Sequence, residues 1–119
     1  MEIKTGYFAN WRKYQNEGYE MIGIVRYVPS YFNGKNLINL APSVELLNDY
    51  KKGLINEDNF REVYNSYLEE NFNLVYSDLA NLNLDKIVLC CFEKPDKFCH
   101  RHILADFLNA KLNLNIKEF

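Results

Sequence analysis

The chain has 119 residues, of which 48% are hydrophobic and 15% are aromatic. This composition excludes a disordered or low-complexity protein, and the length fits one domain, residues 1–119, around a single core. Fourteen basic and sixteen acidic side chains leave a net charge of -2, which argues against a protein held on nucleic acid mainly by bulk positive charge. No apolar run approaches the roughly 18 residues of a membrane helix, so we expect a cytoplasmic protein without membrane contact.

The first half of the chain predicts two strands and two helices. Residues 2–8 alternate in part and indicate a short strand, and residues 20–27 form a continuous apolar stretch typical of a strand covered on both faces. Residues 28–42 carry Pro, Asn and Gly among aromatics and indicate a structured loop, of a length that is often functional. A helix over residues 43–52 follows, and Asn56 is expected to cap a longer one. The apolar face of this longer helix is Phe60, Val63, Tyr64, Tyr67 and Leu68.

The second half predicts a helical segment over residues 74–82, a buried strand over 86–92, a helix over 99–111 and a final strand over 114–119. Strands separated by helices predict an α/β fold, here a layered sandwich with a mostly parallel central sheet flanked by helices. In such sheets ligands bind beyond the carboxyl ends of the strands, where loops meet helix N-termini. A ligand site is therefore expected beyond the strands that end near Tyr27 and Phe92.

The segment 91–102 brings thiols, a carboxylate, imidazoles and a guanidinium together between a strand end and a helix start. Free N–H groups at the helix start, together with Arg101, are expected to hold a phosphate or carboxylate. Glu93 and His100 are candidates for acid–base catalysis. Cys99, in the first helical turn, is a candidate nucleophile or orienting group.

A structural interpretation of the same residues stays open. Cys99 would then fill the core, His100 would bond a backbone carbonyl, and Arg101 would pair with Glu93 to fix the loop. Helical geometry points His100 toward the sheet and His102 toward water, so the two histidines are not expected to be equivalent.

The cysteines restrict what the segment can bind. Cys90, Cys91 and Cys99 are odd in number and close in sequence, so we do not expect the disulfide framework of a small secreted protein. Cys90 and Cys91 alternate across the strand, and only one of them can join a site. Because no Cys-x-x-Cys pair is present, we assign no metal ligand and no cofactor. A zinc or redox protein using Cys91, Cys99 and a histidine remains an alternative.

Two further regions carry candidate contacts. Arg26 lies near the end of a predicted strand and enters an aromatic loop, which makes it a candidate ligand-binding residue. The run Trp11–Lys13, with Tyr31 and Phe32, mixes aromatics and cations as base-stacking surfaces do. A nucleic-acid-binding accessory protein is therefore a second alternative.

Five stretches together resemble a known family, the one called domain of unknown function 488. The stretches are Thr5-Gly6-Tyr7-Phe8, Ile24-Val25-Arg26-Tyr27-Val28-Pro29, Leu40-Ala41-Pro42-Ser43, and above all Cys91-Phe92-Glu93 with Cys99-His100-Arg101. The resemblance covers nearly the whole chain. Gly6 stands where many relatives have Ser, and Val28 stands where a second Pro is common.

This resemblance implies an α/β sandwich of bacterial, archaeal or phage origin, and it implies no established reaction. It marks a shared site consisting of Glu93, Cys99, His100 and Arg101, with Tyr7 and Arg26. We therefore expect a protein that binds a small anionic ligand, either a phosphate-bearing small molecule or a nucleotide, at the loop from Glu93 to Arg101. An enzyme acting on that ligand fits the same residues, with Arg101, Arg26 and Tyr7 as ligand contacts.

Overall fold

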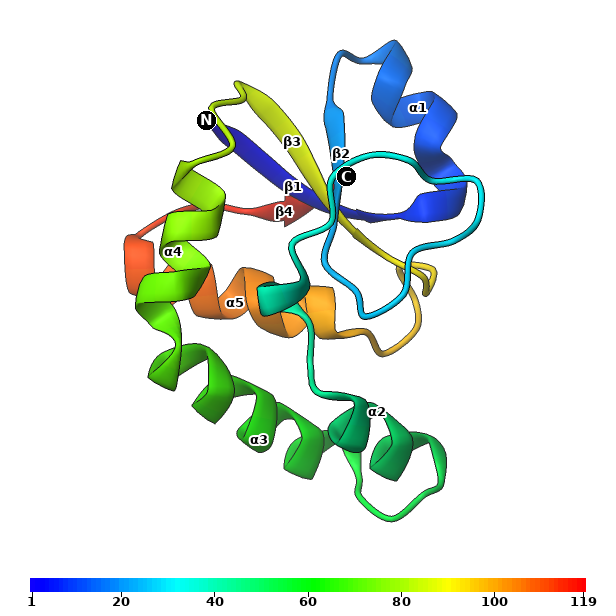
Figure 1. Ribbon diagram of the computed structural model, residues 1–119, viewed down its shortest axis with the longest axis vertical. Coiled ribbons are helices and arrows are strands. Elements are labelled where there is room, and N and C mark those ends of the chain that lie inside the picture. The colour runs from blue at the N-terminus through cyan, green and yellow to red at the C-terminus, as the bar shows by residue number, and fades with distance from the viewer.

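The computed structural model describes the whole chain, residues 1–119, and its centre is a sheet of four parallel strands (Figure 1). The strands stand in the order β2-β3-β1-β4. They are β1 (Glu2–Tyr7), β2 (Glu20–Gly23), β3 (Lys86–Cys91) and β4 (Lys117–Glu118). The central pair, β1 and β3, runs in register from Glu2 beside Lys86 to Tyr7 beside Cys91. The predicted α/β fold with a mostly parallel sheet is confirmed.

Helices cover both faces of this sheet (Figure 1). They are α1 (Trp11–Asn16), α2 (Val44–Lys51), α3 (Glu57–Glu70), α4 (Phe72–Ala80) and α5 (His100–Leu112), with 3-10 turns η1 (Phe8–Asn10) and η2 (Ile38–Leu40). α5 packs directly on β1 and β3, and α3 packs on α5. Alternation along β3 divides the core, because Ile87 and Leu89 pack with α3, α4 and α5, whereas Val88 and Cys90 pack with Tyr14 of α1.

The two predicted helix starts are confirmed by their caps. The Ser43 hydroxyl accepts a hydrogen bond from the Leu46 N–H at 3.1 Å, and the Asn56 side chain accepts one from the Asn59 N–H at 2.8 Å. Along α3 the buried stripe consists of Phe60, Tyr64 and Leu68, which recur every fourth residue. Val63 was predicted on this face, but it lies off the stripe and is 52% exposed.

β2 is shorter than the predicted strand over residues 20–27. It ends at Gly23, after which the Asn36 side chain takes the place of a neighbouring strand. Its oxygen accepts from the Val25 N–H at 3.1 Å, and its amide donates to the Val25 carbonyl at 2.7 Å. Ile24 and Val25 remain buried, which explains why the apolar pattern continues past the end of the strand.

α1 was not predicted, because it is a six-residue helix with one buried side chain, Tyr14, and so has no apolar periodicity. The final strand is reduced to two residues of the predicted 114–119. None of the helices combines the length and the apolar character that crossing a membrane would require.

Candidate functional site

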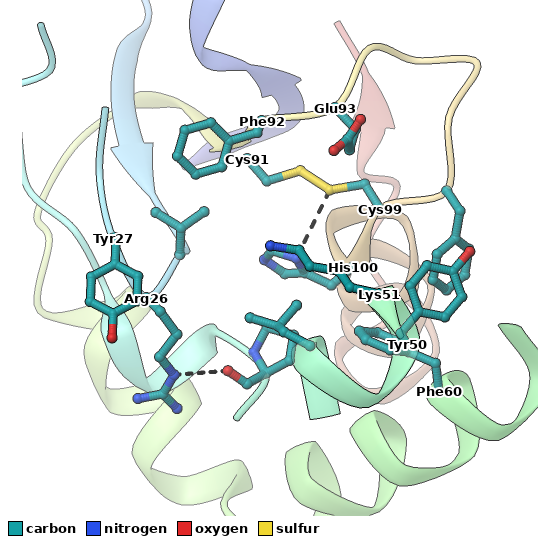
Figure 2. A pocket seen from close by; sticks show the side chains of 14 residues that line it. Arg26, Tyr27, Tyr50, Lys51, Phe60, Cys91, Phe92, Glu93, Cys99 and His100 are labelled. Atoms are coloured by element: carbon teal, nitrogen blue, oxygen red, sulfur yellow. Dashed lines mark hydrogen bonds between the residues drawn. A yellow bond between two sulfur atoms is a disulfide. The ribbon is translucent and has the colours of Figure 1, made fainter. Parts of the chain in front are cut away.

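A pocket of about 300 Å³ opens at the carboxyl edge of the sheet (Figure 2). Residues 25–27, which follow β2, and residues 91–93, at the end of β3, form one side of it. The start of α5 and the last turn of α2 form the other side. The lining is mostly apolar or aromatic, and its polar members are Arg26, Lys51, Glu93 and His100. The pocket lies where the strand ends were expected to place a ligand.

His100, the first residue of α5, is buried and its imidazole has a defined orientation. Its Nε2 lies 2.7 Å from the carbonyl oxygen of Ile24. Because a carbonyl oxygen can only accept, Nε2 carries the hydrogen and Nδ1 carries the free lone pair. Burial lowers the pKa of His100 to about 4, so the ring is neutral at pH 7. The predicted contact between His100 and a backbone carbonyl is thus present, and it leaves Nδ1 available beside Cys99.

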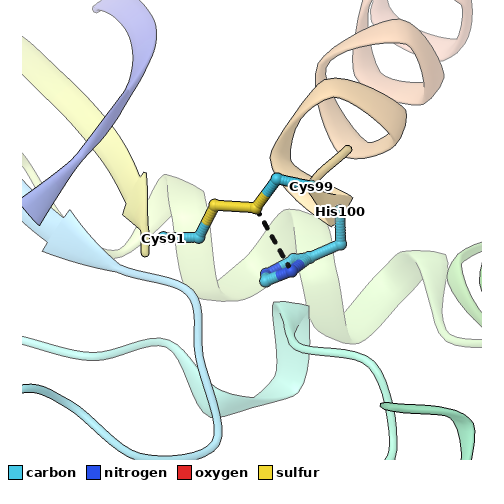
Figure 3. A group of neighbouring side chains, drawn as sticks. All are labelled: Cys91, Cys99 and His100. Atoms are coloured by element: carbon cyan, nitrogen blue, oxygen red, sulfur yellow. Dashed lines mark hydrogen bonds between the residues drawn. A yellow bond between two sulfur atoms is a disulfide. The ribbon is translucent and has the colours of Figure 1, made fainter. Parts of the chain in front are cut away.

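The two cysteines at the site are joined in a disulfide, a pairing that the sequence did not predict. Cys91 ends β3 and Cys99 caps α5, and both are buried. The Nδ1 atom of His100 lies 3.9 Å from the Cys99 sulfur (Figure 3). Cys90 points to the opposite face of the sheet as a free thiol, and burial raises its pKa to about 12. Only one of the two adjacent cysteines therefore joins the site, as strand alternation indicates.

Arg101 is fully buried and lies behind the pocket rather than in its lining. Its guanidinium forms a paired contact with the Glu118 carboxylate, through Nε at 3.0 Å and Nη2 at 2.9 Å. Nη1 donates to the main-chain carbonyl of Glu93 at 2.6 Å and to the sulfur of Cys91 at 2.9 Å. Arg101 thus fixes the loop after β3, and its carboxylate partner is Glu118 rather than Glu93.

Two other cations face the pocket. The Nε of Arg26 donates to the Pro42 carbonyl at 2.8 Å, which anchors the side chain at the pocket wall (Figure 2). Lys51, in the last turn of α2, is exposed at the pocket. Neither residue belongs to an ion pair.

The structure brings together four of the six residues that the sequence singled out, namely Glu93, Cys99, His100 and Arg26. Tyr7 lies outside the pocket lining, at the end of β1, where its backbone N–H donates to the Tyr14 hydroxyl at 3.0 Å. Arg101 is the other residue outside the lining, although it holds two of the lining residues in place.

The predicted orientation of His102 toward water is borne out only in part, because His102 is more exposed than His100 but is half-buried rather than free in water. Its side chain is 36% exposed, and its Nδ1 lies 4.0 Å from a carboxylate oxygen of Glu118. β4 pairs with β1 and carries Glu118 to the first turn of α5, which covers this face of the helix. Burial lowers the pKa of His102 as well.

Several lining residues were missed by the sequence analysis. The sequence pattern predicts core positions for Tyr50, Phe60 and Phe98. It predicts for Lys51 only the common role of a cation near a helix C-terminus. The short loop that ends at Ser43 directs α2 past the strand ends. No local sequence motif predicts that α2 lies there. Glu118 was also missed, since an isolated carboxylate near the chain end gives no sign of a buried partner.

The chain is a parallel α/β sandwich. Its third strand ends in a Cys-x-Glu motif, and its last helix starts with a Cys-His-Arg motif. These features together define the class of protein to which the chain is similar. The chain belongs to the family of domain of unknown function 488: a family model described as the active DUF488-N3 subclade matches residues 7–112. The resemblance seen in the sequence is confirmed. No curated protein and no solved structure matches the chain significantly.

Proposed function

We propose that the pocket binds a phosphate-bearing small molecule or a nucleotide and that the protein acts on it as an enzyme. The observation that carries this proposal is the pair of cations, Arg26 and Lys51, free of carboxylates and facing an aromatic pocket. Guanidinium and ammonium groups bind phosphate oxygens, and aromatic side chains stack on planar bases.

The size of the pocket supports a small ligand. About 300 Å³ lies at the lower end of the range for ligand sites, which favours a mononucleotide or sugar phosphate over a dinucleotide. Tyr27 and Phe92 stand exposed at its edge, where they can contact a ring from both strand ends (Figure 2).

The enzymatic part of the proposal depends on Glu93 and His100. Glu93 is exposed and can accept a proton from a bound water or hydroxyl. His100 is neutral at pH 7 and presents the lone pair of Nδ1, so its role is to accept a hydrogen bond from the ligand. The description of the matching subclade as active agrees with an enzyme.

The test is a thermal-shift screen of nucleoside monophosphates and sugar phosphates. A ligand at a hundredfold excess over its dissociation constant should stabilise the protein by about 2.7 kcal/mol. We expect this shift to disappear in Arg26→Ala/Lys51→Ala. Lys52→Ala is the matched control, because Lys52 is also exposed and lies outside the pocket lining. A ligand that stabilises the double variant as strongly as the wild type would refute the proposal.

A second candidate, nucleic-acid binding, is favoured by another pocket. Trp11, Tyr31 and Phe32, which the sequence singled out, line one cavity of about 370 Å³. The guanidinium of Arg12 stacks on the Trp11 ring at 4.5 Å. This function predicts salt-dependent binding of single strands that Trp11→Ala weakens, whereas Arg26→Ala leaves it unchanged. Binding that does not respond to Trp11→Ala would exclude this surface.

A further inference from the structure

Three ligand atoms of a kind that metal ions bind converge at the base of the pocket. The sulfurs of Cys91 and Cys99 and a ring nitrogen of His100 all lie within 4.8 Å of one another, and all three residues are buried (Figure 3). They come from two elements, the end of β3 and the start of α5, that meet at the carboxyl edge of the sheet.

The histidine is already oriented as a ligand. Metal-binding histidines almost always donate their second ring N–H to a carbonyl or carboxylate, which fixes the tautomer and the ring. His100 does this through Nε2, whose partner is the Ile24 carbonyl at 2.7 Å. Its Nδ1 lone pair is therefore directed to the side on which Cys99 lies, at 3.9 Å.

The thiols also have surroundings that suit a metal ligand. Nη1 of Arg101 lies 2.9 Å from the Cys91 sulfur, so a positive charge faces this sulfur and the pocket has a counter-charge for a thiolate. The charge of Arg101 is in turn balanced by Glu118. Two thiolates and a neutral imidazole would neutralise a divalent cation, so the buried cluster would carry no net charge.

We infer that, when both thiols are reduced, Cys91, Cys99 and His100 bind one Zn²⁺ ion. Two sulfurs and one imidazole nitrogen form a ligand set that zinc prefers among divalent metals. The Cα atoms of Cys91 and Cys99 are 7.4 Å apart. This separation allows two thiolates to share one ion, with their sulfurs about 3.8 Å apart.

Three protein ligands leave the fourth position of a tetrahedral ion free, as in catalytic rather than structural zinc sites. All three residues line the pocket, so the free position opens toward the space where a ligand would lie. A water bound there would be acidified, and Glu93, which also lines the pocket, would be the group to accept its proton. The zinc site does not depend on the phosphate-binding proposal, since metal uptake requires neither Arg26 nor Lys51.

The test measures metal content and spectra on the full chain, purified and kept under a reducing agent. We expect about one equivalent of zinc per chain by elemental analysis. Replacement with Co²⁺ should give thiolate-to-cobalt absorption in the near ultraviolet and intense tetrahedral bands in the visible. Cys99→Ser and His100→Gln should each lower metal content at least tenfold, whereas Cys90→Ser and His102→Gln, the matched controls, should retain it.

The cobalt spectrum of the wild type keeps the test independent of whether the variants fold. Reduced wild-type protein that takes up neither Zn²⁺ nor Co²⁺ at micromolar concentrations would overturn the inference. Equal metal content in the folded Cys99→Ser variant and in the wild type would also overturn it, because the metal would then lie elsewhere. Loss of phosphate binding in Arg26→Ala/Lys51→Ala with metal content unchanged would separate the two proposals.

Discussion

Arg101 stabilises the site through the hydrogen bonds and the ion pair that its buried guanidinium forms. Its side chain is fully buried, yet every nitrogen of the guanidinium has a partner. The Glu118 carboxylate also accepts from the Thr5 hydroxyl at 2.7 Å, so one network joins β1, β4, α5 and the loop after β3. A buried charge of this kind is tolerated only while its partner is present.

We predict that Glu118→Gln lowers the free energy of unfolding by about 3 kcal/mol, because it leaves the buried Arg101 charge unbalanced. Asp58→Asn, which breaks the exposed pair with Arg61, should cost less than about 1 kcal/mol. Urea unfolding followed by circular dichroism measures both. Similar losses in the two variants would show that Arg101 does not need its carboxylate.

His100 makes the stability of the metal-free protein depend on pH. Its pKa is about 4 in the folded state and about 6.5 when unfolded, so below pH 6.5 the unfolded chain binds a proton that the folded chain does not. The resulting stabilisation is complete above pH 6.5 and is lost as the pH falls toward 4. It amounts to about 3 kcal/mol at most.

We therefore expect the difference in unfolding free energy between the wild type and His100→Gln to change as the pH falls from 7 to 4.5. The wild type should lose more stability over this interval, in urea unfolding with a chelator present. Parallel losses in both proteins would mean that His100 does not carry this pH dependence.

At the scale of elements, the sequence predicted what local chemistry decides. Helix starts at Ser43 and Asn56 were identified because their side chains satisfy the first free N–H groups. The end of β2 could not be identified, since it depends on Asn36, a residue thirteen positions beyond Gly23 that pairs with the backbone from another part of the chain. Val63 was misplaced because helical spacing alone does not say how wide the buried stripe is.

β1 and α1 are packed so closely that one glycine is required between them. A Cβ atom at Gly6 would contact the Tyr14 ring at 2.7 Å and the Val88 side chain at 2.8 Å. We predict that Gly6→Ala destabilises the protein by about 1–3 kcal/mol through overpacking. Tyr14→Phe removes the nearest atom, so the double variant should be more stable than the sum of the single losses indicates. Strict additivity in thermal unfolding would contradict this packing.

At the scale of the whole molecule, the pocket is assembled from four separate parts of the chain. The sequence predicted two of them, after β2 and after β3, because ligands of parallel sheets bind beyond the carboxyl ends of the strands. The other two parts, α2 with Tyr50 and Lys51 and α3 with Phe60, reach the pocket by tertiary packing alone. The candidate site was thus predictable where it follows from strand direction and not where it follows from helix placement.

The same architecture predicts a gradient in amide hydrogen exchange. Backbone amides of residues 87–91 in β3 are buried between two strands, so we expect them to exchange only through global unfolding. Residues 93–97, which are exposed, should exchange much faster. Mass spectrometry at several urea concentrations distinguishes exchange through global unfolding from exchange through local opening. Exchange in β3 that does not accelerate with urea would indicate local opening and contradict the prediction.

The pairing of β1 with β3 has a kinetic consequence. Glu2 and Lys86 are neighbours in the sheet but 84 positions apart in the chain. Closing a loop of that length costs on the order of 4 kcal/mol of chain entropy before any contact between the strands compensates for it. Folding should accordingly be slow, as is typical when non-local contacts dominate. Because Cys91 meets α5 and residues 25–27 only on the completed sheet, the pocket and the native state should form in one step, with no earlier intermediate able to hold a ligand.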